Sequence, residues 1–136
     1  MKKKEIFPDI FLIENTKFRD NRGSFQESYN RKTFSNLGIN NDFIQDNISI
    51  SNKEGTIRGL HFQKGKSAQS KLIYVTSGKI LDIFVDIREN SKTFGEHSSI
   101  ELSEKSGCLF IPKGFAHGFC TLEDNTCVLY KVDNFY

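Results

Sequence analysis

Three residues have side chains that together suit proton transfer next to a ketone. His61 is a candidate base, Lys71 is a cation and Tyr130 is a phenol, and proton abstraction next to a ketone needs groups of these three kinds. Each alone is more often structural: a histidine on a strand, a lysine at a sheet edge, or a tyrosine in a core. The prediction of an active site therefore rests on their combination.

Two short stretches supply the remaining candidates. The first, RGLHFQKGKSAQSK, carries Arg58 with His61 and Lys71, and the second, IPKGFAHGF, places His117 after a Pro-x-Gly turn. We interpret the two stretches as halves of one site. Arg58 precedes His61 by three positions, so the two face opposite sides of a regular strand. Both can line one pocket only if the strand bends or bulges, and Gly59 is the expected place.

The rest of the chain predicts the strands that would hold these residues. Short runs of β-branched and aromatic residues, bounded by Gly, Asn, Asp and Ser, are typical of an antiparallel sandwich or barrel. We expect one domain, residues 1–136, with a single short helix at 31–37 that Gly38 ends. The expected strands span residues 10–14, 23–29, 42–51, 56–63, 71–76, 79–87, 98–102, 108–111, 115–121 and 127–132.

One strand carries two acids whose direction the sequence leaves open. Within residues 79–87, four aliphatic side chains share one face, whereas Asp82, Phe84 and Asp86 share the other. The acids would point to solvent on a sandwich with an aliphatic core. They would point into a polar cavity if the strand lined a barrel.

Composition argues against several classes of partner. The 136 residues carry a net charge of +2, which is too balanced to indicate nucleic acid. No apolar run approaches the ~18 residues of a membrane span, and the N-terminus has no signal-peptide pattern. The basic run at residues 2–4 is expected to be solvated. Cys108, Cys120 and Cys127 lack the spacing of a disulfide framework, which predicts free thiols in the cytoplasm.

A metal site of the cupin type is not predicted. Such barrels hold metal through a His-x-His pair, a glutamate and a later histidine after a Pro-x-Gly turn. The later half is present as PKGFAH, but the earlier half reads HFQ, so its second histidine is missing. Because three matching N/O ligands cannot be assembled, we expect no metal.

Seven motifs cover nearly the whole chain in a fixed order: FRDNRGSFQES from residue 18, FIQDN from 43, GTIRGLHFQ from 55, QSKLIYVTSGKILDIFVDIR from 69, SKTFG from 91, LFIPKGFAHGF from 109 and LYK from 129. In this combination the sequence resembles the dTDP-4-dehydrorhamnose 3,5-epimerase family. The resemblance implies a cupin-type jelly roll with minor short helices. It also implies an isomerase that epimerises a nucleotide-linked 4-keto-6-deoxy sugar at C3, C5 or both, in deoxysugar and surface polysaccharide biosynthesis, without metal or dissociable cofactor.

The resemblance also implies roles for individual residues. His61 matches the general base, Tyr130 the acid on the opposite face of the sugar ring, and Lys71 the lysine near the C4 carbonyl. Arg58 and His117 match residues that line the same pocket. The positions that contact the nucleotide and its phosphates are matched by Phe18, Arg22, Glu27, Gln45 and Asn47. In the family some of these come from the partner chain, which implies a homodimer with exchanged N-terminal segments.

One departure from the family pattern concerns the catalytic histidine. Family members usually continue past the LYK strand into a segment whose aspartate hydrogen-bonds that histidine. The chain ends at Tyr136, so we expect this carboxylate to be absent. Asp82 matches an acidic position inside the barrel, and we hypothesise that it substitutes.

Two other functions stay open: a non-catalytic paralogue that binds nucleotide sugars, and a 3,4-ketoisomerase on the same fold. The joint presence of His61, Lys71 and Tyr130 favours the epimerase, because a binding protein would not need all three. Ketoisomerases lack the RGLH and PxGxAHG pairing.

Overall fold

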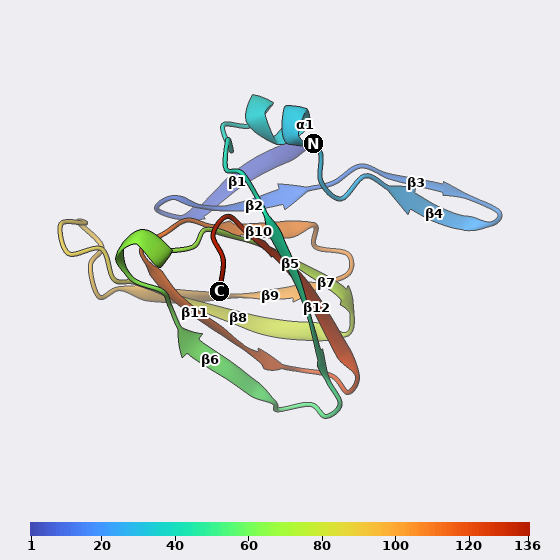
Figure 1. The fold of residues 1–136 in the computed structure, drawn as a ribbon. Coiled ribbons are helices and arrows are strands. Elements are labelled where there is room, and N and C mark those ends of the chain that lie inside the picture. The colour runs from blue at the N-terminus through green and yellow to red at the C-terminus, as the bar shows by residue number, and fades with distance from the viewer.

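The computed structural model describes residues 1–136, and its regular elements are almost all antiparallel strands. They form a six-stranded sheet, a four-stranded sheet and a two-stranded hairpin (Figure 1). The predicted all-β antiparallel fold with minor short helices is confirmed. The elements are β1 (Lys2–Phe7), β2 (Ile10–Glu14), β3 (Lys17–Asp20), β4 (Gly23–Gln26), α1 (Arg31–Asn36), β5 (Gln45–Ser51), β6 (Ile57–His61), the 3-10 helix η1 (Gly65–Ser67), β7 (Lys71–Ser77), β8 (Lys79–Asp86), β9 (His97–Ser103), β10 (Cys108–Ile111), β11 (Phe115–Thr121) and β12 (Thr126–Val132).

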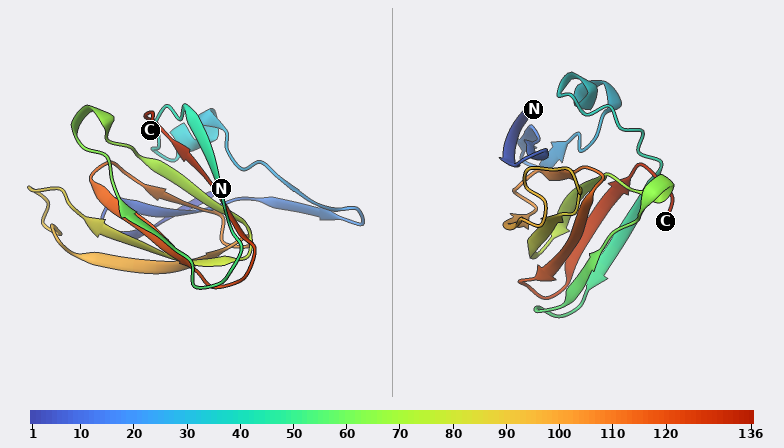
Figure 2. Two further views of the ribbon diagram at one scale, coloured as in Figure 1. Left: turned by 60° about the horizontal axis from the view of Figure 1, so that its bottom comes forward. Right: turned by 90° about the vertical axis from the view of Figure 1, so that its left-hand side faces the viewer.

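The two larger sheets pack against each other as the layers of a jelly roll (Figure 2). The six-stranded sheet has the order β1-β2-β10-β7-β12-β5, and the four-stranded sheet has the order β6-β11-β8-β9. Ile73 and Val128 of the first sheet share one apolar core with Ile80, Phe84 and Phe119 of the second. Consecutive strands β5 and β6 thereby become edge strands of different sheets.

The acids of β8 lie on the inner face of the fold. Ile80, Asp82, Phe84 and Asp86 are buried, and the residues between them are only partly so. The acids therefore point inward rather than to solvent, but they do not face an open polar cavity, because Asp82 pairs with His117 and Asp86 with Arg88. Leu81, Ile83 and Val85 lie on the outer face of β8.

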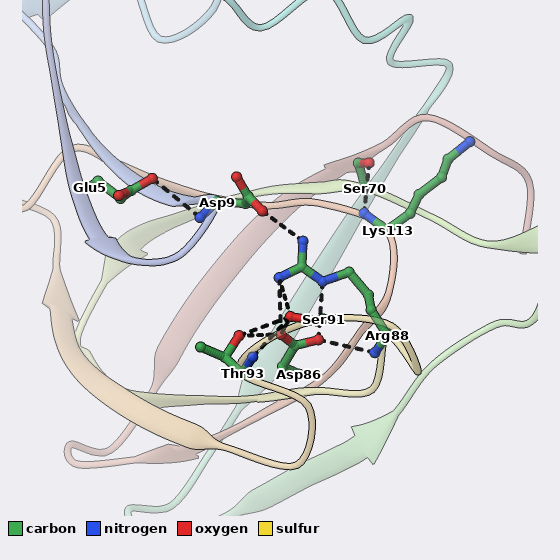
Figure 3. A network of polar contacts seen from close by, with 8 residues as sticks. All are labelled: Glu5, Asp9, Ser70, Asp86, Arg88, Ser91, Thr93 and Lys113. Atoms are coloured by element: carbon green, nitrogen blue, oxygen red, sulfur yellow. Dashed lines mark hydrogen bonds and ion pairs between the residues drawn. The ribbon is translucent and has the colours of Figure 1, made fainter.

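Asp86 is neutralised by a local polar network (Figure 3). Its carboxylate accepts hydrogen bonds from the Arg88 guanidinium at 2.9 and 3.0 Å and from the hydroxyls of Ser91 and Thr93. Burial alone would raise the pKa of Asp86, but these donors hold it well below its usual range. Arg88 also pairs with Asp9 at 2.7 Å, which ties the β1–β2 turn to the loop after β8.

A second apolar cluster lies on the other side of the six-stranded sheet and is covered by α1. Asn30 caps this helix by accepting hydrogen bonds from the N–H groups of residues 32 and 33. Phe34 is the buried residue of the helix and packs with Ile13, Leu72 and Phe110. The helix was predicted over residues 31–37 and ends one residue earlier.

Two strands were not predicted. The basic run at residues 2–4 belongs to β1, an edge strand whose exposed lysines leave the edge solvated. The other is β3, which pairs with β4 in a hairpin that projects from the body (Figure 1). The strand predicted over residues 23–29 ends at Gln26, because the Asn15 side chain donates to the carbonyls of Glu27 and Ser28.

Candidate active site

Five strands from both sheets line a cavity of about 450 Å³. A second cavity of about 710 Å³ shares four of its lining residues. The two adjoin and form one site. The first cavity is lined by Asn47, Ile48, Ser49, Ile50, Arg58, His61, Lys71, Ile73, His117, Gly118, Phe119, Val128 and Tyr130. The second is lined by Gln45, Asn47, His61, Phe62, Gln63, Gln69, Lys71, Tyr130 and Tyr136.

Most of the predicted site residues meet in this cavity: His61, Lys71, Tyr130, Arg58, His117, Gln45 and Asn47 line it, and Asp82 lies behind its wall. Phe18, Arg22 and Glu27 do not. Phe18 and Arg22 lie on the projecting hairpin, and Arg22 pairs there with Asp20. Within one chain the residues predicted to contact the nucleotide are therefore split between two places.

A bulge at Gly59 lets Arg58 and His61 line the same cavity. On β11, His117 pairs with His61 and Phe119 pairs with Arg58, so one more residue lies between the partners on β6 than between those on β11. Gly59 has a φ of +99°, and an added Cβ would lie 2.7 Å from the carbonyl oxygen of His117. The predicted place of the bulge is confirmed.

Arg58 is aimed by the neighbouring edge strand. Its Nε donates to the hydroxyl of Ser51 and one of its terminal nitrogens donates to the carbonyl of Ile50, both at 3.0 Å. The guanidinium is thereby fixed beside the cavity with donors still free for an anionic ligand.

His61 is exposed on the cavity wall, and no group of the chain hydrogen-bonds its ring. Partial burial lowers the pKa of His61, and the positive charges of Lys71 and His117 lower it further. This ring therefore stays neutral to a lower pH than an ordinary histidine, as a general base must.

Asp82 hydrogen-bonds His117 rather than His61. Its Oδ2 lies 2.7 Å from the Nε2 of His117, and both side chains are buried. Burial raises the pKa of Asp82, with partial compensation from His117 and Lys71. The hypothesis that Asp82 orients His61 is therefore corrected: its partner is the other cavity histidine.

Lys71 is 7% exposed, and its ammonium makes no hydrogen bond within the chain. It lies 5.9 Å from the centroid of the Tyr130 ring. Burial lowers the pKa of Lys71, although Asp82 partly offsets this effect. A buried cation without a bound acceptor is suited to an oxygen that becomes negative during a reaction.

Several lining residues were not predicted. Ser49 follows Gln45 and Asn47 at a spacing of two, so strand alternation alone could have added it. Ile73 and Val128 form an apolar part of the wall and carry no chemical signal in the sequence. No group of three or more His, Cys, Asp or Glu side chains is arranged to hold a metal ion, and no helix is long and apolar enough to cross a membrane.

Comparison with known proteins points to one family. The family model described as dTDP-4-dehydrorhamnose 3,5-epimerase matches residues 4–136. The enzyme of that name from Salmonella typhimurium is 47% identical over 135 residues, which cover 98% of this chain and 73% of the relative. The crystal structure of the Bacillus anthracis enzyme, with TDP and PPi bound, has a TM-score of 0.95 at 51% identity and covers 98% of this chain and 77% of its own. The Legionella pneumophila enzyme in complex with dTDP-4-keto-L-rhamnose has a TM-score of 0.91 at 40% identity, covering 97% and 70%.

Proposed function

The chain belongs to the dTDP-4-dehydrorhamnose 3,5-epimerase family, and we propose that it epimerises a dTDP-linked 4-keto-6-deoxy sugar through the cavity between its sheets. One observation carries the proposal. His61 enters the cavity from the four-stranded sheet, whereas Tyr130 enters it from the six-stranded sheet. A base and an acid on opposite walls are what inversion of a carbon requires.

The first step breaks a C–H bond next to the C4 ketone. The neutral imidazole of His61 takes the proton, and the electron pair moves onto the C4 oxygen as an enolate. Such a proton is only weakly acidic, so the imidazole alone is a poor match for it. Lys71 offers its ammonium to the enolate oxygen, and a single donor of this kind contributes about 3–4 kcal/mol.

The second step restores the ketone with the opposite configuration. The phenol of Tyr130 gives its proton to the same carbon from the other face, while the electron pair returns from the oxygen. Tyr130 lies on β12, which neighbours the strand that carries Lys71. Asp82 acts indirectly, because its carboxylate holds the ring of His117 in the cavity wall.

Binding of the nucleotide involves residues from two places in the fold. We assign Arg58, Gln45 and Asn47 to the chain's own cavity and Phe18, Arg22 and Glu27 to a second copy. The hairpin supports this division, because Phe18 and Phe25 form a cross-strand pair that is 63% and 71% exposed. An isolated two-stranded hairpin is only marginally stable in water. A homodimer with exchanged hairpins would bury both rings and bring the two sets together.

The three free thiols fit a cytoplasmic location.

Solvent exchange tests the activity. The protein is incubated with dTDP-4-keto-6-deoxyglucose in D2O, and deuterium at C3 and C5 is followed by NMR, with the GDP-linked sugar as a comparison. Uptake at C3 and C5 supports a 3,5-epimerase, and uptake at one carbon a single-centre epimerase. Absence of uptake despite dTDP binding would refute the proposal in favour of a binding protein.

A further inference from the structure

Lys71 is positioned through its backbone rather than through its ammonium group. The side chain has no hydrogen-bond acceptor within the chain, and a flexible four-carbon stem fixes no position by itself. The residue before it, Ser70, is 2% exposed. Ser70 takes part in hydrogen bonds with Asp133 and Lys113, directly before Lys71, the first residue of β7.

Asp133 has both carboxylate oxygens engaged. Oδ1 accepts the N–H of Ser70 at 2.7 Å, and Oδ2 accepts the side-chain amide of Asn41 at 2.9 Å. The N–H of Asp133 donates in return to the carbonyl of Ser70 at 3.3 Å. One carboxylate thus joins the exit of β12, the loop before β7 and the segment between α1 and β5. Hydrogen bonds to an ionised acceptor are stronger than neutral ones.

Ser70 is also hydrogen-bonded to the turn before β11, the strand that carries His117. The hydroxyl of Ser70 accepts the N–H of Lys113 at 3.1 Å, in the turn that leads into β11 (Figure 3). Asp133 directly follows β12, which carries Tyr130, and Val132 of that strand pairs with Lys71. Asp133 and Ser70 therefore connect the backbones that carry three side chains of the cavity.

We propose that Asp133 is a positioning residue of the reaction, because its carboxylate fixes the Ser70–Lys71 backbone and thereby places the Lys71 ammonium in the cavity. This inference rests on the role proposed above for Lys71. The titratable groups that face this ammonium are His61 of β6, Asp82 of β8, His117 of β11 and Tyr130 of β12. None of them touches the carboxylate of Asp133, so its effect on Lys71 is mechanical.

The test combines turnover with a direct titration of the Lys71 ammonium. Protein labelled with 15N-lysine is titrated by NMR, and the Lys71 signal is assigned by its loss in Lys71→Met. In Asp133→Ala the loosened loop admits water, so the depressed pKa of Lys71 rises toward its ordinary value. We expect kcat to fall about tenfold while the Kd for dTDP stays within about twofold. Asp133→Asn keeps an acceptor for the N–H of Ser70 but loses the one for the amide of Asn41, so it should restore most of both losses.

Asp124→Ala is the matched control. Asp124 also accepts a backbone N–H from a distant segment, that of Glu54 at 2.8 Å, but it lies at the opposite end of β12. This variant should leave the Lys71 titration unchanged.

An unchanged pKa of Lys71 in folded Asp133→Ala would overturn the inference, even if stability fell. If that variant does not fold, Asn41→Ala releases one oxygen only, and a smaller rise in the pKa is expected; no rise would overturn the inference equally. The titration needs no turnover, so failure of the proposed epimerase activity and failure of the positioning role are distinguishable.

Discussion

The Nε2 atom of His117, in the wall of the cavity, lies 2.7 Å from the Oδ2 atom of Asp82, which is buried behind that wall. Asp82 and His117 are diagonal neighbours across β8 and β11, because Asp82 pairs with Phe119 and His117 pairs with Phe84. The other oxygen of Asp82 has no hydrogen-bond partner. The carboxylate therefore fixes the ring of His117 and places a negative charge near Lys71, but it makes no hydrogen bond with His61.

Asp82→Asn should lower turnover without weakening nucleotide binding. The substitution removes the carboxylate charge that holds His117. The same charge also offsets part of the lowering of the Lys71 pKa by burial, so that effect is lost as well. A small displacement of an active-site group can cost up to about 100-fold in rate, so we expect kcat to fall about 10–100-fold. Asp82 is buried and does not line the cavity, so the Kd for dTDP should stay within about twofold. Steady-state kinetics and calorimetry measure the two quantities.

Asp46→Asn is the control for that change. Asp46 is exposed and pairs with Lys131, away from the cavity. It should leave kcat unchanged. A near-normal rate in Asp82→Asn would mean that the Asp82 carboxylate does not contribute to catalysis.

The pH dependence of kcat/KM should show an acid limb below pH 6.5. The pKa of His61 is lowered from 6.5 by partial burial and by the charges of Lys71 and His117. A base acts in its neutral form, so activity is lost only as the pH falls through this depressed value. Lys71→Met removes one positive charge, and NMR titration of the His61 ring should then give a higher pKa. An acid limb with its midpoint above pH 6.5 in the wild type would argue against His61 as the base.

Gly59→Ala should destabilise the fold and reduce activity together. The new Cβ would lie 2.7 Å from the carbonyl oxygen of His117 and 2.9 Å from the Cα of Gly118. Gly55 also has a positive φ, +80°, but an added Cβ there meets nothing within 4 Å. Both variants share the strain of a positive φ, so urea unfolding should show Gly59→Ala to be less stable than Gly55→Ala by the cost of the clash, about 1–3 kcal/mol. Equal losses in the two variants would mean that close packing at the bulge is not required.

Phe25→Glu should weaken self-association. Phe25 and its partner Phe18 lie on the projecting hairpin, and a charge there opposes burial against a second copy. Sedimentation velocity should show a shift from dimer to monomer together with weaker dTDP binding. Phe94→Glu alters another exposed phenylalanine, in the loop between β8 and β9, and should have no effect. A stable dimer in Phe25→Glu would place the interface elsewhere.

Strand periodicity predicted the central part of the fold. Residues 108–111 and 115–121 form strands with the expected bounds, and the need for Arg58 and His61 to share a pocket located the bulge at Gly59. Periodicity could not give the partner of Asp82, because that depends on the register between β8 and β11. It also missed β1, since three consecutive lysines have low strand propensity and form a strand only by pairing with β2.

Tyr130→Phe tests most directly the claim that His61 and Tyr130 act on opposite faces of one sugar ring. The variant keeps the base and Lys71 but has no phenolic proton. Incubated with dTDP-4-keto-6-deoxyglucose in D2O, it should still incorporate deuterium next to the ketone, because His61 can return a solvent-derived deuteron to the face it came from. Inversion at the same carbon should fall by about 100-fold or more. Inversion at the wild-type rate, or equal loss of exchange and inversion, would contradict the two-face mechanism.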